Sequence, residues 1–234
     1  MILNLGILLD LKEIDGVVKY IVNHKYVHSL KASTKEEIKL NIVKITYEDE
    51  LELMGLDGVV LVGGGKYSEK IKFRPTLEEA NPERYIFEKK LIHYCRKNNI
   101  PVLGICKGTQ MINEVFGGAV DYIDNTKDID HNCKKTRHTI TIEDETLLRQ
   151  IYNKEELLTN SFHLKEIKAL STDFNIAAIS EDGIIEAIES KFEPLFLGVQ
   201  WHPEAMEKEE YHPLFNHFIN HCATKKSSNK TKVF

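Results

Sequence analysis

The first half of the chain alternates apolar runs with segments of helical periodicity. Uninterrupted apolar residues predict strands, at 3–10, 41–45, 56–65 and 100–106. Apolar positions at helical spacing predict helices between these strands, over 26–40, 82–99 and 108–118. Apolar runs without alternation are typical of parallel strands that are covered on both faces. The first half therefore predicts an α/β fold, a three-layer sandwich with a mostly parallel central sheet flanked by helices.

The second half follows a different pattern. Residues 120–137 are polar and irregular, which predicts a surface loop. Short strands separated by turn residues follow, at 138–144, 176–180, 184–189 and 195–201. These strands predict extra antiparallel strands in the C-terminal half, and a last helix is expected over 212–222.

Length and composition describe an ordinary globular chain. The 234 residues contain no linker or repeat, so we expect one domain over 1–223 and a disordered polar tail over 224–234. A net charge of −5 argues against a nucleic-acid partner. No apolar run approaches the ~20 residues of a membrane span, so no membrane partner is expected. Four dispersed cysteines without a C-x-x-C pair are typical of a reducing compartment and favour a cytoplasmic location.

The segment "GICKGTQ" at 104–110 carries the first candidate chemistry. A buried strand ends in G-x-C-x-G and leads into a helix, which is the pattern of a nucleophile elbow. Cys106 would then lie at a helix N-terminus, where the dipole favours thiolate. The backbone N–H of Lys107 would point to the developing oxyanion. Taken alone, this cysteine is better explained by packing at the end of a strand.

A second motif, "LGVQWHPE" at 197–204, supplies partners for the thiol. His202 would act as general base and acid, and Glu204 would orient its imidazole. In an extended segment, residues two apart face the same side, so these two side chains can meet. The chain order cysteine, histidine, acid differs from the nucleophile, acid, histidine order of α/β-hydrolases.

Beyond these motifs, the chain resembles the class I glutamine amidotransferase-like superfamily. "PVLGICKGTQMINEVFGG", "NSFH" and "FLGVQWHPE" carry the resemblance, which covers roughly residues 3–220. "NSFH" and "DGIIEAIE" favour its γ-glutamyl peptidase branch, which includes γ-glutamyl-GABA hydrolase. The resemblance implies that a small γ-glutamyl amine or amino acid is hydrolysed through a γ-glutamyl thioester on Cys106, without a cofactor.

The resemblance also implies roles for residues around this cysteine. A second oxyanion N–H would come from the triglycine loop, from Gly64 or Gly65. The glutamyl group would be bound by a set of four side chains: Gln110, Ser161, Phe162 and His163. Lys66, Tyr67 and Tyr85 depart from the pattern of many hydrolase relatives, and they border the expected position of the leaving group.

Two questions stay open in the sequence. The same residues suit the glutaminase subunit of a two-chain amidotransferase, which would deliver ammonia to a partner synthetase. Self-association into a homodimer is also open. His131, Cys133 and His138 match no common zinc spacing and fall in the predicted polar loop, so we predict no metal ligands.

Overall fold

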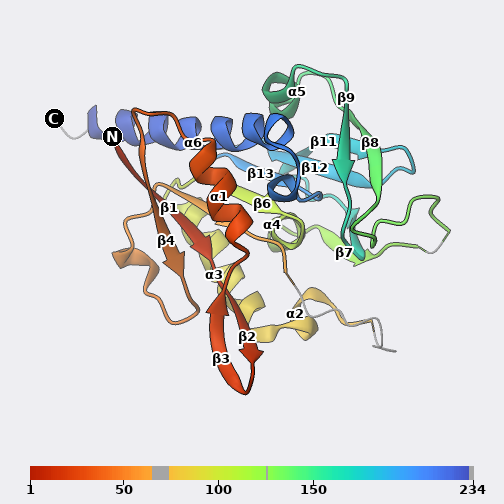
Figure 1. Cartoon of the computed structure of the whole chain (residues 1–234), viewed down its shortest axis with the longest axis horizontal. Coiled ribbons are helices and arrows are strands. Elements are labelled where there is room, and N and C mark those ends of the chain that lie inside the picture. Colours follow the sequence, from red (N-terminus) through yellow and green to blue (C-terminus); the bar gives the residue numbers. More distant parts are fainter. Residues whose placement is uncertain (65–73, 125, 232–234) are drawn as a thin grey trace.

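The computed structural model describes residues 1–64, 74–124 and 126–231 (Figure 1). Its centre is a nine-stranded sheet with the order β4-β1-β5-β6-β13-β12-β11-β8-β9. Five strands at one side pair in parallel: β4 (Lys39–Ile45), β1 (Ile2–Leu8), β5 (Gly58–Leu61), β6 (Val102–Ile105) and β13 (Phe196–Val199). This parallel half brings the carboxyl ends of β6 and β13 side by side, with Ile105 opposite Val199.

Antiparallel strands complete the sheet. They are β12 (Ile185–Ser190), β11 (Phe174–Ser180), β8 (Arg137–Ile142) and β9 (Glu156–Asn160). Within the sheet, β12 and β8 run against the direction of the other strands. The predicted α/β architecture with added antiparallel strands is therefore confirmed.

Helices cover both faces of the sheet (Figure 1). One face carries α1 (His24–Ala32), α5 (Leu147–Tyr152) and α6 (Lys208–Thr231). The other carries α2 (Leu77–Ala80), α3 (Pro82–Lys97) and α4 (Lys107–Val115). Strand β5 shows why an uninterrupted apolar run is required, since Val60 packs into the first core and Val59 and Leu61 into the second. No helix in the described ranges is long and apolar enough to cross a membrane.

Two small ribbons lie outside the main sheet. β2 (Asp10–Ile14) and β3 (Val17–Ile21) form a hairpin whose turn residues, Asp15 and Gly16, both have positive φ. An Asp-Gly pair is a strong signal for this turn type, although our sequence analysis assigned no element there. The second ribbon pairs β7 (Ala119–Tyr122) with β10 (Lys165–Ala169). Two 3-10 helices, Leu51–Leu53 and Pro203–Ala205, complete the fold.

Helix boundaries differ from the sequence prediction at two places. The helix expected over 26–40 ends at Ala32, where the Ser33 N–H caps it, and Lys39 and Leu40 belong to β4 instead. At the C-terminus, we expected a helix over 212–222 and a disordered tail over 224–234. Instead α6 runs from Lys208 to Thr231, and 232–234 lie outside the described residues. Lys226 helps to hold this extension through an ion pair with Asp57.

Candidate active site

Cys106 occupies the sharp turn between β6 and α4. Its φ of 54° and ψ of −108° place a non-glycine residue in a strained conformation. The Cys106 N–H donates to the Val199 carbonyl at 2.7 Å, which ties the turn to the end of β13. This geometry is that of the predicted nucleophile elbow, with the thiol at a helix N-terminus.

Two glycines allow neighbouring segments to approach the Cys106 turn closely. A side chain at Gly63 would place its Cβ 2.8 Å from His202 Cε1 and 3.4 Å from Cys106 Cβ. A Cβ at Gly108 would overlap the Leu61 carbonyl oxygen. The small residues therefore let β5, α4 and the segment after β13 meet, and they bring His202 beside Cys106.

His202 and Glu204 follow the end of β13 and form a close pair. His202 Nδ1 lies 2.8 Å from Glu204 Oε1, and the carboxylate side chain is 3% exposed. Since an ionised carboxylate only accepts, Nδ1 carries the proton and Nε2 carries the lone pair of the neutral imidazole. Nε2 is left for the Cys106 thiol, with which His202 interacts, so it is the ring nitrogen that can act as a base.

Two residues that the sequence analysis did not assign hold His202 in place. Asn160, at the end of β9, accepts from the His202 N–H and donates to the His202 carbonyl, each at 2.8 Å. Tyr26 on α1 accepts from the Gly63 N–H at 3.2 Å and lies 3.4 Å from His202 Nδ1. Asn160 opens the "NSFH" motif, so the motif pointed to the right segment, but it gave no sign that Asn160 clamps His202.

The charges of this group favour an ion pair. Burial by itself raises the pKa of the Cys106 thiol, but the charge and hydrogen bonding of His202, the charge of His163 and the Lys107 N–H bring it below its ordinary value. Burial lowers the pKa of His202, yet the Cys106 thiolate and Glu204 raise it well above its ordinary value. By contrast, burial raises the pKa of Cys95 and of Cys222. Among these buried thiols, Cys106 is the one whose surroundings favour thiolate.

Of the predicted oxyanion donors, Lys107 and Gly64 lie within the described residues and Gly65 does not. Lys107 is the first residue of α4, and its backbone N–H donates to the Cys106 thiol. Gly64 has a φ of +145° and follows Gly63, whose surroundings include Cys106. Gly65, Lys66 and Tyr67 lie outside the described residues.

A buried ionic network lies next to the end of β5, before Gly63. Arg84 on α3 donates from Nη2 to the Val62 carbonyl at 2.8 Å and from Nε to Glu88 at 2.8 Å. Glu88 also pairs with Lys107 Nζ at 2.6 Å, so the Lys107 side chain is directed into the protein. Burial lowers the pKa of Lys107 to about 8, against the opposing effect of Glu88. The network joins α3, α4 and the strand end that precedes Gly63.

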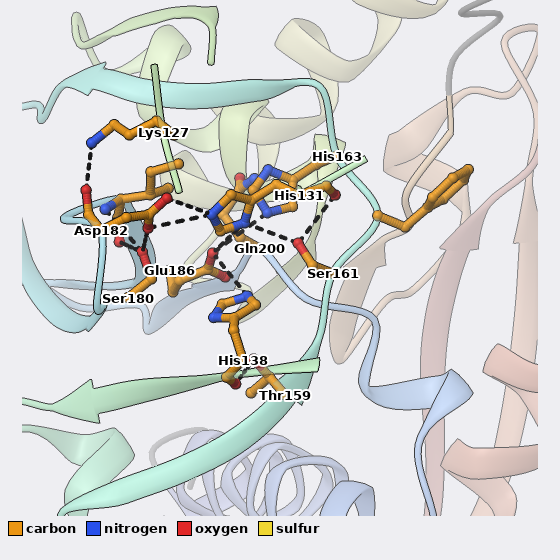
Figure 2. A network of polar contacts seen from close by, with 12 residues as sticks. Lys127, His131, His138, Thr159, Ser161, His163, Ser180, Asp182, Glu186 and Gln200 are labelled. Atoms are coloured by element: carbon orange, nitrogen blue, oxygen red, sulfur yellow. Dashed lines mark hydrogen bonds and ion pairs between the residues drawn. The ribbon is translucent and has the colours of Figure 1, made fainter. Parts of the chain in front are cut away.

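The four predicted glutamyl-binding side chains do not share one environment. Phe162 is 41% exposed, and its carbonyl lies 3.8 Å from Cys106 Sγ, so this residue borders the thiol. The buried Gln110 side chain donates to the Lys165 carbonyl at 3.0 Å. Ser161 and His163 are turned into a separate buried polar cluster (Figure 2). Their roles toward a substrate remain predictions.

Comparison with known proteins agrees with this fold and arrangement. The family description Peptidase C26 matches residues 6–204, which include all three predicted catalytic residues. The nine-stranded α/β sheet, with a cysteine in the strand-to-helix turn, is similar to the fold of class I glutamine amidotransferases. The chain belongs to the Peptidase C26 family.

Three curated relatives with described activities are similar to this chain. The chain is 31% identical over 149 residues to gamma-glutamyl-CDP-amidate hydrolase of Campylobacter jejuni, covering 64% of this chain and 62% of that protein. It is 28% identical over 184 residues to gamma-glutamyl-gamma-aminobutyrate hydrolase of Escherichia coli, covering 71% and 72%. It is also 28% identical over 209 residues to the glutamine-hydrolyzing GMP synthase chain of Sulfolobus acidocaldarius, covering 86% and 93%.

A solved structure shows the same fold at lower sequence identity. The glutaminase domain of Trypanosoma brucei CTPS, with bound acivicin, aligns with a TM-score of 0.68 at 16% identity. The alignment covers 95% of this chain and 94% of that chain. The shared architecture therefore extends over nearly the whole chain.

Proposed function

We propose that this protein is a cysteine hydrolase that cleaves the γ-glutamyl amide bond of a small γ-glutamyl amine or amino acid and releases glutamate. The observation that carries the proposal is the meeting of Cys106, His202 and Glu204 at the adjacent carboxyl ends of β6 and β13. Ligands of open α/β sheets bind at this edge. Membership of Peptidase C26 and the two γ-glutamyl hydrolases among the relatives support the substrate class.

The first half of the proposed reaction forms a thioester. The Cys106 thiolate attacks the γ-carbonyl carbon, and the backbone N–H groups of Lys107 and Gly64 or Gly65 stabilise the oxyanion. As the tetrahedral intermediate collapses, the carbon–nitrogen bond breaks, and His202 donates its Nε2 proton to the leaving amine. Glu204 stabilises the imidazolium and keeps the proton of Nδ1 in place.

The second half returns the enzyme to its starting state. Neutral His202 takes a proton from water, and the resulting hydroxide attacks the thioester carbon. The carbon–sulfur bond breaks, glutamate leaves, and Cys106 returns to thiolate beside imidazolium. Every proton that His202 donates in the first half is recovered in the second.

A second candidate is the glutaminase subunit of a two-chain amidotransferase. The GMP synthase relative, aligned over most of both chains, favours this alternative. The chemistry at Cys106 would be identical, with ammonia as the leaving group. The two candidates differ in whether the isolated chain turns over substrate without a synthetase.

A glutamate-release assay tests both candidates. The purified chain is incubated with glutamine, γ-glutamyl amines, γ-glutamyl amino acids and γ-glutamyl peptides. Turnover of a γ-glutamyl amine or amino acid by the isolated chain is expected. Release from glutamine alone, and only with an added synthetase, would favour the two-chain amidotransferase, and no release from any compound would contradict both candidates.

The Cys106→Ala variant tests the mechanism. We expect kcat to fall by roughly 10⁴-fold or more, because the thioester cannot form. Cys95→Ala is the matched control, since Cys95 is also buried but lies in the apolar core on α3. A Cys106→Ala protein that remains folded and active would contradict the cysteine mechanism.

A further inference from the structure

A buried cluster of three histidines and one glutamate lies in the antiparallel half of the sheet (Figure 2). Glu186 on β12 is fully buried, and one of its oxygens, Oε1, faces a ring nitrogen of each histidine. The separations are 3.5 Å to His131 Nδ1, 3.6 Å to His138 Nε2 and 3.4 Å to His163 Nε2. The sequence analysis predicted a surface loop over 120–137, but His131 of this segment is buried in the protein interior.

In His163 and His138, one ring nitrogen faces a backbone carbonyl and the other faces Glu186. The contact with the carbonyl determines which nitrogen carries the proton. His163 Nδ1 lies 3.0 Å from the Lys165 carbonyl and His138 Nδ1 lies 3.4 Å from the Thr139 carbonyl. A carbonyl only accepts, so both Nδ1 atoms carry the proton, and in the neutral rings both Nε2 atoms present a lone pair to Glu186. These outer contacts set the tautomers of His163 and His138.

His131 repeats the arrangement with a carboxylate. Its Nε2 lies 3.2 Å from Asp182 Oδ2, and Asp182 also accepts from the Ser180 hydroxyl at 2.6 Å. A proton on Nε2 leaves the Nδ1 lone pair toward Glu186. Ser161 Oγ lies 3.0 Å from the same Nδ1 and 3.1 Å from the His131 carbonyl, and its single hydroxyl proton can point to either atom.

The centre of the cluster is short of close hydrogen bonds, and without an ion its one source of positive charge facing Glu186, in the described part of the chain, is a proton on His163, whose pKa burial lowers and Glu186 raises. Neither oxygen of Glu186, nor His138 Nε2 or His163 Nε2, has a hydrogen-bond partner among the described residues. A buried carboxylate in that position is costly unless a positive charge lies against it. Asp182 adds a second buried negative charge, so a divalent cation would offset both.

We propose that His131, His138, His163 and Glu186 bind a divalent transition-metal ion of the zinc type. Imidazole and carboxylate are ligands that Zn²⁺ accepts, and ligating histidines commonly donate their other N–H to a carbonyl or carboxylate, as all three do here. Four ligands at about 2.1 Å from a tetrahedral ion stand roughly 3.4 Å apart, close to the nitrogen–oxygen separations in the cluster. The ligand atoms of His131, His138 and Glu186 lie within 4.8 Å of one another, so binding requires a modest closure of the rings.

The ion would join segments that are distant in sequence. His131 precedes β8, His138 lies on β8, Glu186 lies on β12, and His163 lies between β9 and β10. The His163 segment also contains Asn160 and Phe162, which border His202 and Cys106. The ion would therefore brace one wall of the candidate active site without contacting the reacting atoms.

Metal binding is tested in the Cys106→Ala protein, so that the thiolate cannot be a ligand. Chelator-treated protein is titrated with Zn²⁺, gel-filtered and analysed for metal by mass spectrometry. We expect one equivalent of zinc, and at least a tenfold weaker affinity after adding His138→Gln or Glu186→Gln. His93→Gln is the matched control, because His93 is exposed on α3. No retained zinc, or zinc retained equally by both cluster variants, overturns the proposal.

A second measurement leaves the cluster unmutated and so does not depend on the folding of the variants. X-ray absorption of the zinc-loaded Cys106→Ala protein should show only nitrogen and oxygen neighbours at about 2.0–2.2 Å, with the scattering of three imidazoles. Sulfur in the first shell, or fewer than three imidazoles, overturns the proposal. Neither measurement uses hydrolysis, so failure of the metal site and failure of the proposed activity are separately visible.

Discussion

The parallel and antiparallel halves of the sheet each place histidine beside glutamate, with different consequences. At the ends of β6 and β13, His202 pairs with Glu204 through one ring nitrogen and lies beside the Cys106 thiol, and its side chain is 17% exposed. In the antiparallel half, three histidines surround Glu186, and all four side chains are almost fully buried. The first arrangement places a base beside a thiol at an edge of the sheet, whereas the second is enclosed by the protein.

The difference follows from where the side chains originate. His202 and Glu204 are two residues apart at a strand end, where the edge of the sheet leaves room for a ligand. The members of the cluster come from four separate segments that pack over the interior. Strand ends therefore suit chemistry on an outside molecule, while buried cross-strand groups suit a ligand that becomes part of the structure.

The largest expected effect concerns the His202–Glu204 pair. Glu204→Gln should lower kcat by roughly 10²–10⁴-fold, because the imidazolium loses its stabilising carboxylate. The pKa of His202 should also fall, since Glu204 raises it, so the alkaline limb of the pH–rate profile should move to lower pH. Steady-state kinetics across pH measure both effects. Glu207→Gln, an exposed neighbour, is the control, and an unchanged Glu204→Gln profile would remove Glu204 from the mechanism.

The next effect concerns the stability supplied by the buried ion pairs of Arg84. Arg84→Met removes the cation that pairs with Glu88 and Asp10, and leaves buried carboxylates short of a partner. We expect a loss of about 3–5 kcal/mol in the free energy of unfolding, measured by urea denaturation. Arg137→Met is the control, because its ion pair with Glu210 is partly exposed and worth about 0–1 kcal/mol. Equal losses in the two variants would contradict the importance assigned to the network.

A smaller effect is expected from Asn160. Asn160→Ala removes both hydrogen bonds to the His202 backbone, each worth about 0.5–1.5 kcal/mol, and should lower kcat by roughly tenfold with a smaller change in KM. Asn216→Ala, which removes a side-chain bond to the Ser33 carbonyl far from the thiol, should leave kcat unchanged. If the two variants had the same kcat, Asn160 would be a general structural residue and no positioning role would remain.

The smallest effect is a shift in the pH dependence of thiol alkylation. Thiolate at Cys106 is present above its lowered pKa and is lost as pH falls through that value. In His202→Gln the lowering charge is gone and burial remains, so the pKa should rise and alkylation should require higher pH. Peptide mass spectrometry with iodoacetamide follows the site, and absence of label on the fully buried Cys222 verifies that the protein stays folded. An unchanged Cys106 profile would show that His202 does not activate the thiol.

The geometry of the site could be predicted from local motifs where the interacting residues are close in sequence. The strand-to-helix turn at Cys106 and the pair His202 and Glu204 could be recognised because glycine spacing and strand periodicity determine their geometry. The clamp by Asn160 could not, since it depends on β9 lying against the segment after β13. The buried Lys107 side chain was also missed, because its partner Glu88 lies one turn along α3 from Arg84 and far from Lys107 in sequence.

The sequence by itself determined the three-layer α/β architecture and the place of the predicted nucleophile, because apolar periodicity and turn residues act over a few positions. Only the tertiary structure decided the surroundings of the histidines. His131 and His163 were predicted as a loop residue and a substrate contact, yet strand pairing brings both against Glu186. The strand register and the order of the sheet set these long-range contacts, and side-chain burial then decides whether a histidine faces a substrate or another buried charge.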